Sequence, residues 1–450
     1  MSDEILMPQL PNREDGRIAR WLVGAGQEVA AGDVLAEIET ASSTLEIEAS
    51  GGGRIERILV PAGGRTIPAG TPLAVIGANA SAGARPRRGE PPKSEPAREA
   101  VASRSIALDR TAGDAGEAEG RISLSYRLAL HEALAREMRR DGRVFVIGVG
   151  VALNRGAIEV TKGLLDEFGA DRVVSVPPCE EAFTGLAIGA AYAGLKPVVS
   201  FESWGAALPA LAPIVHAAAR AEAVSGGLLA PSIVFRGPVG EDSAVGAGAD
   251  REMTAGLHSI GGLDVVVPSD AASAYALLVT AIRSGRPVAI LEPACLYETE
   301  GEVPLAGIDA AIGRARVRRQ GNTLTMVACG GGVQTALLTA EQLSPQGIDI
   351  EVVDLVSLRP LDMGTVLASV CKTGCVLTVE DRWSSGAIGS EVVARVAEEA
   401  WPALKSAPLR LSPRGPAGRE PAASGFSDRL APEEVADAVR RLVHGRLKQG

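Results

Sequence analysis

Short apolar segments alternate with helical segments along most of the chain, and this alternation limits the possible folds more than any other feature. The segments "RVFVIGVGV" (143–151) and "PVAILEP" (287–293) have the length and composition of buried strands, whereas "SYRLALHEALAREMRRD" (125–141) has the apolar spacing of an amphipathic helix. Strands joined through helices pair in parallel, with helices on both faces and sites at the carboxyl ends of the strands. We therefore predict an α/β domain over residues 121–305 and a second, smaller one over 321–447.

Residues 1–78 follow a different pattern, with alternating strand-like segments separated by Gly. The segment "LVGAGQEVAAGDVLAEI" (22–38) resembles "LVPAGGRTIPAGTPLAVI" (59–76), with one residue inserted. Two similar halves predict a flattened β-barrel or sandwich with quasi-twofold symmetry. Such a repeat supports a fold and not an activity.

Residues 79–120 are rich in Ala, Pro and charged residues and have no lasting periodicity. This composition predicts an extended, semi-stiff tether between the N-terminal domain and the rest of the chain. A chain of 450 residues is also too long for one core, which agrees with three folded parts.

Charge and hydropathy exclude several classes of partner. The net charge of −10 argues against nucleic-acid and anionic-membrane binding. The start "MSDEILMPQL" is no signal peptide, and no stretch reaches 18 apolar residues. The five cysteines form no CxxC and no metal-ligand spacing, so we interpret them as small buried apolar residues. We expect a soluble protein of a reducing, cytoplasmic compartment.

The most informative segment is "VVSVPPCEEAFTGLAIGAAYAGLKPVVSF" (173–201), in which Glu180 and Glu181 separate a strand from a Gly/Ala-rich helix. Carboxylates in the first turn of a helix are stabilised by its dipole. Composition alone therefore favours a helix-capping role for the pair over a catalytic one.

Residues 1–78 resemble the lipoyl/biotinyl carrier domain through "PQL", "GRIARWLV", "AGDVLAEIET" and "TLEIEA". In that family a lysine at the tip of the hairpin carries the cofactor. Ser42 occupies that position here, and no lysine precedes Lys93. Because attachment requires an amine, we predict that this chain carries no lipoyl group, which leaves the domain as a docking module or a relic.

Residues 121–447 resemble thiamin-diphosphate enzymes, and more narrowly the β subunit of 2-oxo acid dehydrogenases. The resemblance rests on "GAIEVTKGLLDEFGADRV", "FTGLAIGAAYAGLKPVV", "SGG", "VFRGP", "AIRSGRPVAILEP", "SLRPLDM" and "TVED". It implies a transketolase-like pyrimidine-binding domain followed by a transketolase C-terminal-like domain. With the carrier-like domain and tether, the chain resembles the long-form pyruvate dehydrogenase β subunits of some bacteria.

The resemblance assigns one catalytic role. The family's glutamate hydrogen-bonds N1′ of the aminopyrimidine ring of thiamin diphosphate and stabilises the imino tautomer, whose nitrogen takes the C2 proton of the thiazolium. The motif places this role on Glu180, gives Glu181 only the capping role, and places an aromatic residue beside the cofactor pocket at Phe183.

The other end of the cofactor implies a partner. The diphosphate needs Mg²⁺ and a Gly-Asp-Gly motif with a downstream Asn, and we find no such pair in a strand-loop setting of this chain. The family solution is a separate α subunit that binds Mg²⁺ within an α2β2 assembly. The resemblance also implies the acyltransferase component of a 2-oxo acid dehydrogenase complex as a partner.

The chain departs from the family at three places that affect catalysis. The family has two adjacent acids where Val149 and Gly150 stand, and a histidine lining the pocket where ungapped counting gives Ala249. A family aromatic corresponds to Ala206, with Trp204 nearby. The nearest histidine to Ala249 is His258, for which a structural role is the favoured interpretation.

Some members of the family also bind potassium through backbone carbonyls, and carbonyl ligation tolerates side-chain substitutions. The loops that match this site are "SIVFRGP" and "AIRSGRP". The carbonyls of the resulting candidate potassium site belong to Ile233, Ala281, Ile282, Ser284 and Arg286.

Three functions remain open at this stage. The leading one is the β subunit of a pyruvate, or related 2-oxo acid, dehydrogenase that decarboxylates the acid and passes the acyl group to lipoamide. The second is a thiamin-diphosphate decarboxylase or carboligase of a specialised pathway. The third is a degenerate, non-catalytic subunit, which the loss of the lysine, the acid pair and the histidine would suit. Retention of Glu180 favours the first two.

The absence of an amine at the hairpin tip makes a direct prediction. Protein isolated from a lipoylating host is expected to show the unmodified mass over residues 1–92, because a serine hydroxyl at Ser42 cannot form the amide. Intact-mass and peptide-mass measurements check this, with a lipoylated carrier domain from the same host as the control. A lipoyl adduct within residues 1–92 would contradict the prediction.

Overall fold

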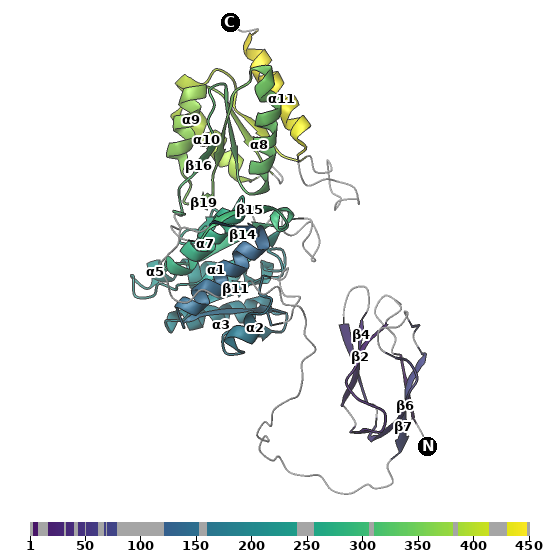
Figure 1. The fold of residues 1–450 in the computed structure, drawn as a ribbon. Coiled ribbons are helices and arrows are strands. Elements are labelled where there is room, and N and C mark those ends of the chain that lie inside the picture. Colours follow the sequence, from purple (N-terminus) through teal and green to yellow (C-terminus); the bar gives the residue numbers. More distant parts are fainter. Residues whose placement is uncertain are drawn as a thin grey trace. The chain divides into compact units, whose positions relative to one another are not determined.

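The computed structural model describes most of the chain. The described residues are 3–7, 17–30, 33–39, 44–49, 51–61, 67–68, 70–78, 121–152, 160–240, 256–305, 310–380, 386–413 and 430–447. The chain divides into two compact units, Met1–Arg110 and Thr111–Gly450, and each is described by itself (Figure 1).

The N-terminal unit consists of two antiparallel sheets around one apolar core. One sheet has the strand order β1-β7-β6-β3, and the other has the order β2-β4-β5. The strands are β1 (Asp3–Leu6), β2 (Arg17–Trp21), β3 (Glu28–Val29), β4 (Val34–Glu39), β5 (Thr44–Glu48), β6 (Gly53–Ile58) and β7 (Pro72–Ala78). Ile18, Leu35, Ile38, Ile55 and Leu73 are nearly or fully buried and form the centre of this core.

The internal repeat of the sequence has a structural counterpart. The pairing of β2 with β4 is interrupted by a bulge after Ile18, and the pairing of β6 with β7 by a bulge after Ile55. Each half also contains the equivalent backbone hydrogen bond. In the first half Leu22 N donates to Leu35 O at 2.9 Å, and in the second Leu59 N donates to Leu73 O at 2.8 Å. The predicted quasi-twofold sandwich is therefore present in the backbone.

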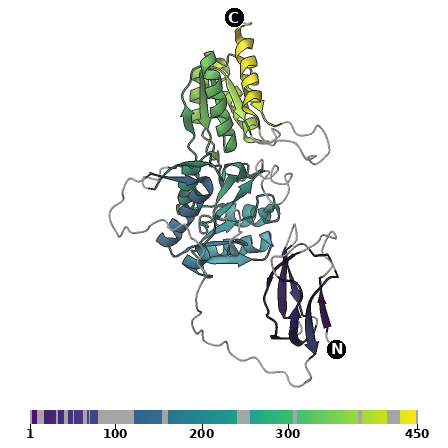
Figure 2. The same ribbon diagram turned by 45° about the vertical axis from the view of Figure 1, so that its right-hand side comes forward.

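The second unit contains a seven-stranded sheet in the order β10-β9-β11-β12-β14-β13-β19, in which every pair except β13–β19 is parallel (Figures 1 and 2). The strands are β9 (Val144–Val149), β10 (Val173–Val176), β11 (Lys196–Ser200), β12 (Val234–Val239), β13 (Asp264–Val266), β14 (Val288–Pro293) and β19 (Ser357–Arg359). The predicted parallel sheet is confirmed. A two-stranded ribbon of β8 (Arg121–Ser125) and β15 (Glu300–Pro304) was not predicted.

Helices cover both faces of this sheet because its strands are apolar on both sides. Val144 and Val146 of β9 face a core that includes α1 and α7, whereas Phe145 and Ile147 face the core that includes α3. The helices of this part are α1 (Tyr126–Arg140), α2 (Leu164–Phe168), α3 (Glu180–Tyr192), η3 (Leu208–Ala210), α4 (Leu211–Pro213), the π-helical η4 (Ile214–Ala219), α5 (Ala221–Val224), α7 (Ala271–Arg283) and η5 (Ala294–Leu296).

A second sheet has the order β16-β18-β17-β20-β21 and is parallel except for β16. Its strands are β16 (Arg316–Arg319), β17 (Leu324–Ala328), β18 (Ile350–Asp354), β20 (Val376–Val379) and β21 (Leu409–Leu411). Its helices are α8 (Gly331–Leu343), η6 (Ser344–Gln346), α9 (Met363–Thr373), α10 (Ile388–Glu399), η7 (Trp401–Ala403) and α11 (Pro432–Leu447). Helices α8 and α11 pack together, as do α9 and α10, on opposite sides of the sheet (Figure 1).

The segment "IDIEVVDLVSL" (348–358) has the apolar pattern of one strand of the smaller domain, but it forms two strands in different sheets. β18 ends at Asp354 and stays in the second sheet, whereas β19 pairs antiparallel with β13 at the edge of the first. The turn between them contains Val356, a buried β-branched residue at φ 58°. Such residues rarely adopt the left-handed region, which is why apolar periodicity could not reveal the break.

Buried polar side chains form hydrogen bonds at the point where the chain passes from the second sheet to the first. Asp354 is 1% exposed and accepts hydrogen bonds from Ser269 Oγ at 2.5 Å and from Val356 N at 3.0 Å. Arg318 of β16 donates to Ser269 Oγ at 3.0 Å and pairs with Asp270, the N-cap of α7, at 2.9 Å. Burial raises the pKa of Asp354 despite these donors.

At the centre of the first sheet, a fully buried ion pair joins β12 to β14. Arg236 donates to both oxygens of Glu292, at 2.6 and 2.5 Å, and to Ser200 Oγ of β11 at 2.7 Å. Tyr297 OH donates to Glu292 at 2.6 Å. Burial alone would lower the pKa of Arg236, but Glu292 raises it above its ordinary value, so the guanidinium stays charged.

Across the described residues, no helix is both long enough and apolar enough to cross a membrane.

The buried ion pair predicts a large effect of removing one partner. Arg236→Leu is expected to lower the free energy of unfolding by about 3–5 kcal/mol, because Glu292 would remain buried without its cation. Arg395→Leu removes an exposed i,i+4 pair with Glu399 and is expected to cost less than about 1 kcal/mol. Urea unfolding monitored by circular dichroism measures both; equal, small losses would contradict this account.

Candidate active site

Glu180 lies at the first position of α3, directly after the turn that follows β10. Pro177 and Pro178 occupy this turn and prevent the helix from beginning earlier. The N-cap residue is Cys179, which makes no side-chain capping hydrogen bond. The carboxylate therefore lies at the positive end of the helix dipole, at the carboxyl edge of the parallel sheet.

The two glutamates of the motif differ in their surroundings. Glu180 is partly buried, whereas Glu181 is exposed. Both stand in the first turn of α3, where the helix dipole favours carboxylates as composition predicted. The interaction with the helix dipole accounts for an exposed carboxylate at Glu181. Glu180 is partly buried, which makes it the candidate for a role in a site.

An aromatic floor lies beside Glu180. Phe183, one turn along α3, is 4% exposed, and its ring centroid is 5.9 Å from that of Phe201 at the end of β11. Phe201 in turn lies 5.5 Å from Trp204, whose Nε1 donates to Ile290 O at 3.0 Å. Phe183 is therefore a core residue that supports the first turn of α3, and its place beside a cofactor pocket remains a prediction.

The same edge of the sheet contains several of the positions at which the chain departs from the family that it resembles. Val149 ends β9 and pairs with Val176 of β10, so Val149 and Gly150 lie beside the strand that leads to Glu180. Gly150 has φ 64°, a conformation that suits glycine. Ala206 is partly buried in the segment after β11. Ala249 lies outside the described residues.

Sequence reasoning missed one ionisable residue at this edge. Glu202 directly follows Phe201 and is exposed by surface area, yet enough protein surrounds its carboxyl group for burial to raise its pKa, and the charge of Glu180 raises it further. The signal in the sequence was an acidic residue two positions after the end of a buried strand, "VVSFES", at the edge where sites form.

The groups around Glu180 suit an aminopyrimidine ring. A partly buried carboxylate can hydrogen-bond a ring nitrogen, and the buried Phe183 ring, packed on Phe201, supports the helix turn that carries it. One turn further along α3, Thr184 is fully buried and its hydroxyl has no hydrogen-bond partner within the described part of the chain. An unpaired buried hydroxyl is costly, and a polar ligand or water at this end of the helix would relieve it.

The described residues hold no group of three or more His, Cys, Asp or Glu side chains that could bind a metal ion.

The residues of the candidate potassium site lie together, but at the opposite edge of the sheet. Ile233 immediately precedes β12, and its carbonyl accepts from Val288 N, at the start of β14, at 3.0 Å. Ala281 and Ile282 are in the last turn of α7. The Ser284 hydroxyl lies 2.9 Å from Ala281 O and 3.3 Å from Arg286 O. These residues thus lie near the amino ends of β12 and β14, where the carbonyls of Ile233 and Ala281 already accept hydrogen bonds within the protein.

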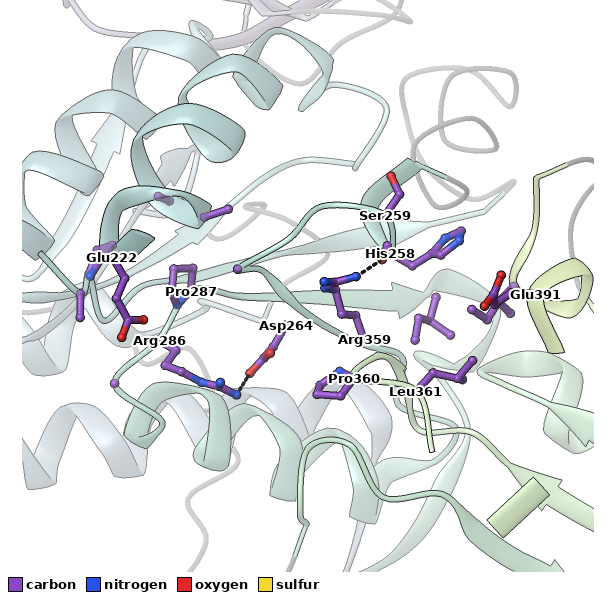
Figure 3. Close-up of a pocket in the computed structure, with 18 of the residues that line it drawn as sticks. Glu222, His258, Ser259, Asp264, Arg286, Pro287, Arg359, Pro360, Leu361 and Glu391 are labelled. Atoms are coloured by element: carbon purple, nitrogen blue, oxygen red, sulfur yellow. Dashed lines mark hydrogen bonds and ion pairs between the residues drawn. The ribbon is translucent and has the colours of Figure 1, made fainter. Parts of the chain in front are cut away.

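A cavity of about 680 Å³ opens at this amino edge (Figure 3). Its wall includes Arg286, which pairs with Asp264, and Arg359, which donates to His258 O at 3.2 Å. His258 precedes β13 and lines this cavity, whereas Glu180 follows β10 at the carboxyl edge. His258 is therefore not placed to replace the missing family histidine.

In the N-terminal unit, β4 and β5 form the expected hairpin, with Glu39 paired to Thr44. Ser42 lies outside the described residues.

Three family descriptions match the chain in sequence. "Biotin-requiring enzyme" matches residues 3–76, "Transketolase, pyrimidine binding domain" matches 122–299, and "Transketolase, C-terminal domain" matches 313–423. The multidomain fold predicted from the sequence is thus confirmed. The exact domain limits of 1–78, 79–120, 121–305 and 321–447 remain predictions.

Relatives align along the whole chain. The "Pyruvate dehydrogenase E1 component subunit beta" of Rhizobium meliloti (strain 1021) is 38% identical over 99% of this chain and 100% of its own length. The chain belongs to the family of pyruvate dehydrogenase E1 component β subunits. Other members are the Rickettsia conorii protein, 40% identical over 64% of this chain and 89% of its own length, and the mitochondrial β-1 subunit of Arabidopsis thaliana, 38% identical over 72% and 89%.

Solved structures agree on the fold of this E1 β-family chain. A protein titled "Split gene transketolase, inactive beta4 tetramer" superposes with a TM-score of 0.58 over 71% of this chain and 98% of its own, at 23% identity. A transketolase variant from Pichia stipitis gives a TM-score of 0.51 over 72% of this chain and 46% of its own, at 17% identity.

The double role of Phe183 gives a stability prediction. Phe183→Ala is expected to lower the free energy of unfolding by about 3–5 kcal/mol, because it opens a cavity against Phe201. Leu186→Ala, on the same helix but 60% exposed, is expected to cost less than about 1 kcal/mol. Urea unfolding of the two variants tests this, and a Phe183→Ala protein as stable as Leu186→Ala would show that the ring is not part of the core.

Proposed function

We propose that this chain is the β subunit of a thiamin-diphosphate-dependent pyruvate dehydrogenase E1 component, which decarboxylates pyruvate oxidatively and transfers the acyl group to lipoamide. One observation carries the proposal: Glu180 is partly buried at the start of α3, above the Phe183–Phe201 contact, at the carboxyl edge of a parallel sheet. End-to-end similarity to E1 β subunits gives that geometry its chemical meaning.

Each residue of the proposed site has a limited task. Thiamin diphosphate supplies the carbanion chemistry of decarboxylation. Glu180 hydrogen-bonds N1′ of the aminopyrimidine and holds a proton at that atom. Phe183 fixes the first turn of α3 against β11 and so fixes the direction of the carboxylate. Thr184 offers a buried hydroxyl one turn away.

The proposal requires a second chain. The diphosphate and its Mg²⁺ are bound by an α subunit, and the complete site forms between subunits in an α2β2 assembly. The support for this division is the sequence, in which no Gly-Asp-Gly motif with a downstream Asn stands in a strand-loop setting.

The remaining cofactor proposals follow the same family. Potassium binds the carbonyls gathered before β12 and β14, where it stabilises the amino edge of the sheet without touching the substrate. No lipoyl group is attached to this chain, because Ser42 replaces the lysine. The acyltransferase component of the complex supplies the lipoyl arm that accepts the acyl group.

A decarboxylase or carboligase is the second candidate. It is favoured by Val149 and Gly150, which leave the strand end beside Glu180 without the acid pair of the family. Supplying pyruvate and an aldehyde to the assembled enzyme separates the two, because only carboligation yields a hydroxyketone.

The central test compares adjacent glutamates. The chain is co-purified with its α-like subunit, and 2-oxo acid decarboxylation is measured with an artificial electron acceptor. Glu180→Gln is expected to lower the rate by about a hundredfold or more, since it removes the proton-holding group. Glu181→Gln, exposed in the same turn, is the matched control and is expected to retain the wild-type rate.

A cofactor-loaded complex with no activity in the wild type would instead support the degenerate subunit. Wild-type activity that survives in Glu180→Gln would remove the proposed role of Glu180.

A further inference from the structure

Glu202 is an acidic residue that the proposed reaction does not use, although it lies at the same edge of the sheet as Glu180. β11 ends at Ser200, which pairs with Gly148 of β9, and β10 pairs with β9 on the other side. The ends of β10 and β11 are therefore two strand spacings apart, roughly 10 Å. Glu180 and Glu202 follow these two strand ends at the carboxyl edge of the sheet.

Packing of α3 brings the two glutamates nearer. The Phe183 and Phe201 rings meet with centroids 5.9 Å apart, so the first turn of α3 lies on the end of β11. Glu180 is three residues before Phe183 on the helix, and Glu202 is the residue after Phe201. Residues i and i+3 share one side of a helix, which places Glu180 toward this contact.

The charges of the two carboxylates interact. Burial raises the pKa of Glu202, and the Glu180 charge raises it further. Like charges at this distance disfavour simultaneous ionisation unless a cation lies between them.

Few other charged groups among the described residues face this end of α3. The elements that pack on the helix are β9, β11, η3, α4 and η4. β9, η3 and α4 contain no ionisable side chain. Lys196 begins β11 at its opposite end and pairs with Asp141. His216 belongs to η4, which meets the far end of α3 through the bond from Tyr192 OH to Ala217 O. On α3 itself, Glu181 is exposed.

We propose that Glu202 is a positioning residue for Glu180, and that its carboxylate supplies the negative charge that keeps a proton on N1′ of the bound aminopyrimidine. The inference rests on the proposed function, because it assumes that the ring binds at Glu180. Glu202 touches neither substrate nor cofactor and acts through the electrostatic potential at Glu180.

The sign of the effect follows from Coulomb's law. A protonated N1′ is positive, so an ionised Glu202 stabilises the protonated ring and raises the pH at which the ring loses its proton. Removing the charge moves the protonation midpoint to lower pH. For two charges near a protein surface, the interaction corresponds to a shift of about half a unit to one unit, or roughly threefold to tenfold in the protonation equilibrium.

The test uses the full chain assembled with its α-like subunit and loaded with thiamin diphosphate. Wild type, Glu202→Gln, Glu202→Asp and Glu181→Gln are compared. The circular-dichroism bands of the bound aminopyrimidine are followed across pH, and the dissociation constant for thiamin diphosphate is measured by quenching of tryptophan fluorescence. Thermal unfolding of each complex verifies that the variants fold.

Glu202→Gln is expected to move the spectroscopic midpoint down by about half a unit or more, with the dissociation constant at pH 7 changed less than about tenfold. Glu202→Asp keeps the charge, so its midpoint is expected to lie closer to that of the wild type than to that of Glu202→Gln. Glu181→Gln, whose carboxylate is solvated, is expected to move it by less than half as much as Glu202→Gln.

Two results overturn the inference. An unchanged midpoint in Glu202→Gln shows that the charge of Glu202 does not affect protonation of N1′. Equal shifts in Glu202→Gln and Glu181→Gln show that any nearby negative charge has the same effect, so that Glu202 has no specific role. Failure of the proposed function is distinguishable from both. A wild-type complex that does not bind thiamin diphosphate, or a Glu180→Gln complex with an unaltered spectrum, removes the aminopyrimidine from this site and both proposals with it.

Discussion

The buried pair of Arg236 and Glu292 is the constraint on which the rest of the larger unit depends. A guanidinium and a carboxylate tolerate full burial only when their donors and acceptors are paired, so their geometry fixes β12 against β14. The bond to Ser200 adds β11 to the same register. Because Glu202 and the aromatic floor follow directly after β11, the ion pair also sets where the site can form.

The two edges of the first sheet have separate tasks. The carboxyl edge presents Glu180, Glu202 and the Phe183–Phe201 contact. The amino edge gathers backbone carbonyls beside the cavity lined by Arg286 and Arg359.

Much of this architecture was predictable, and the exceptions have physical causes. Strand–helix alternation predicted the parallel sheet, and "VPPCEEAF" predicted a carboxylate at a helix start. The crossing of β19 was missed because the break is a backbone conformation at Val356, which leaves the apolar pattern intact. Glu202 was missed because its place near Glu180 depends on the contact between Phe183 and Phe201, 18 residues apart in sequence, which an acidic residue after a strand end does not reveal by itself.

The crossing at Val356 has a consequence for how this protein can be divided. β19 belongs by sequence to the second α/β part but completes the first sheet beside β13, and Asp354 is buried against Ser269 from that first part. A chain cut between the two parts would leave β13 as an unprotected edge strand and Asp354 as a buried acid without its main donor. The two α/β parts are thus not interchangeable modules. A recombined or split form of this unit would have to keep β19 together with the first sheet.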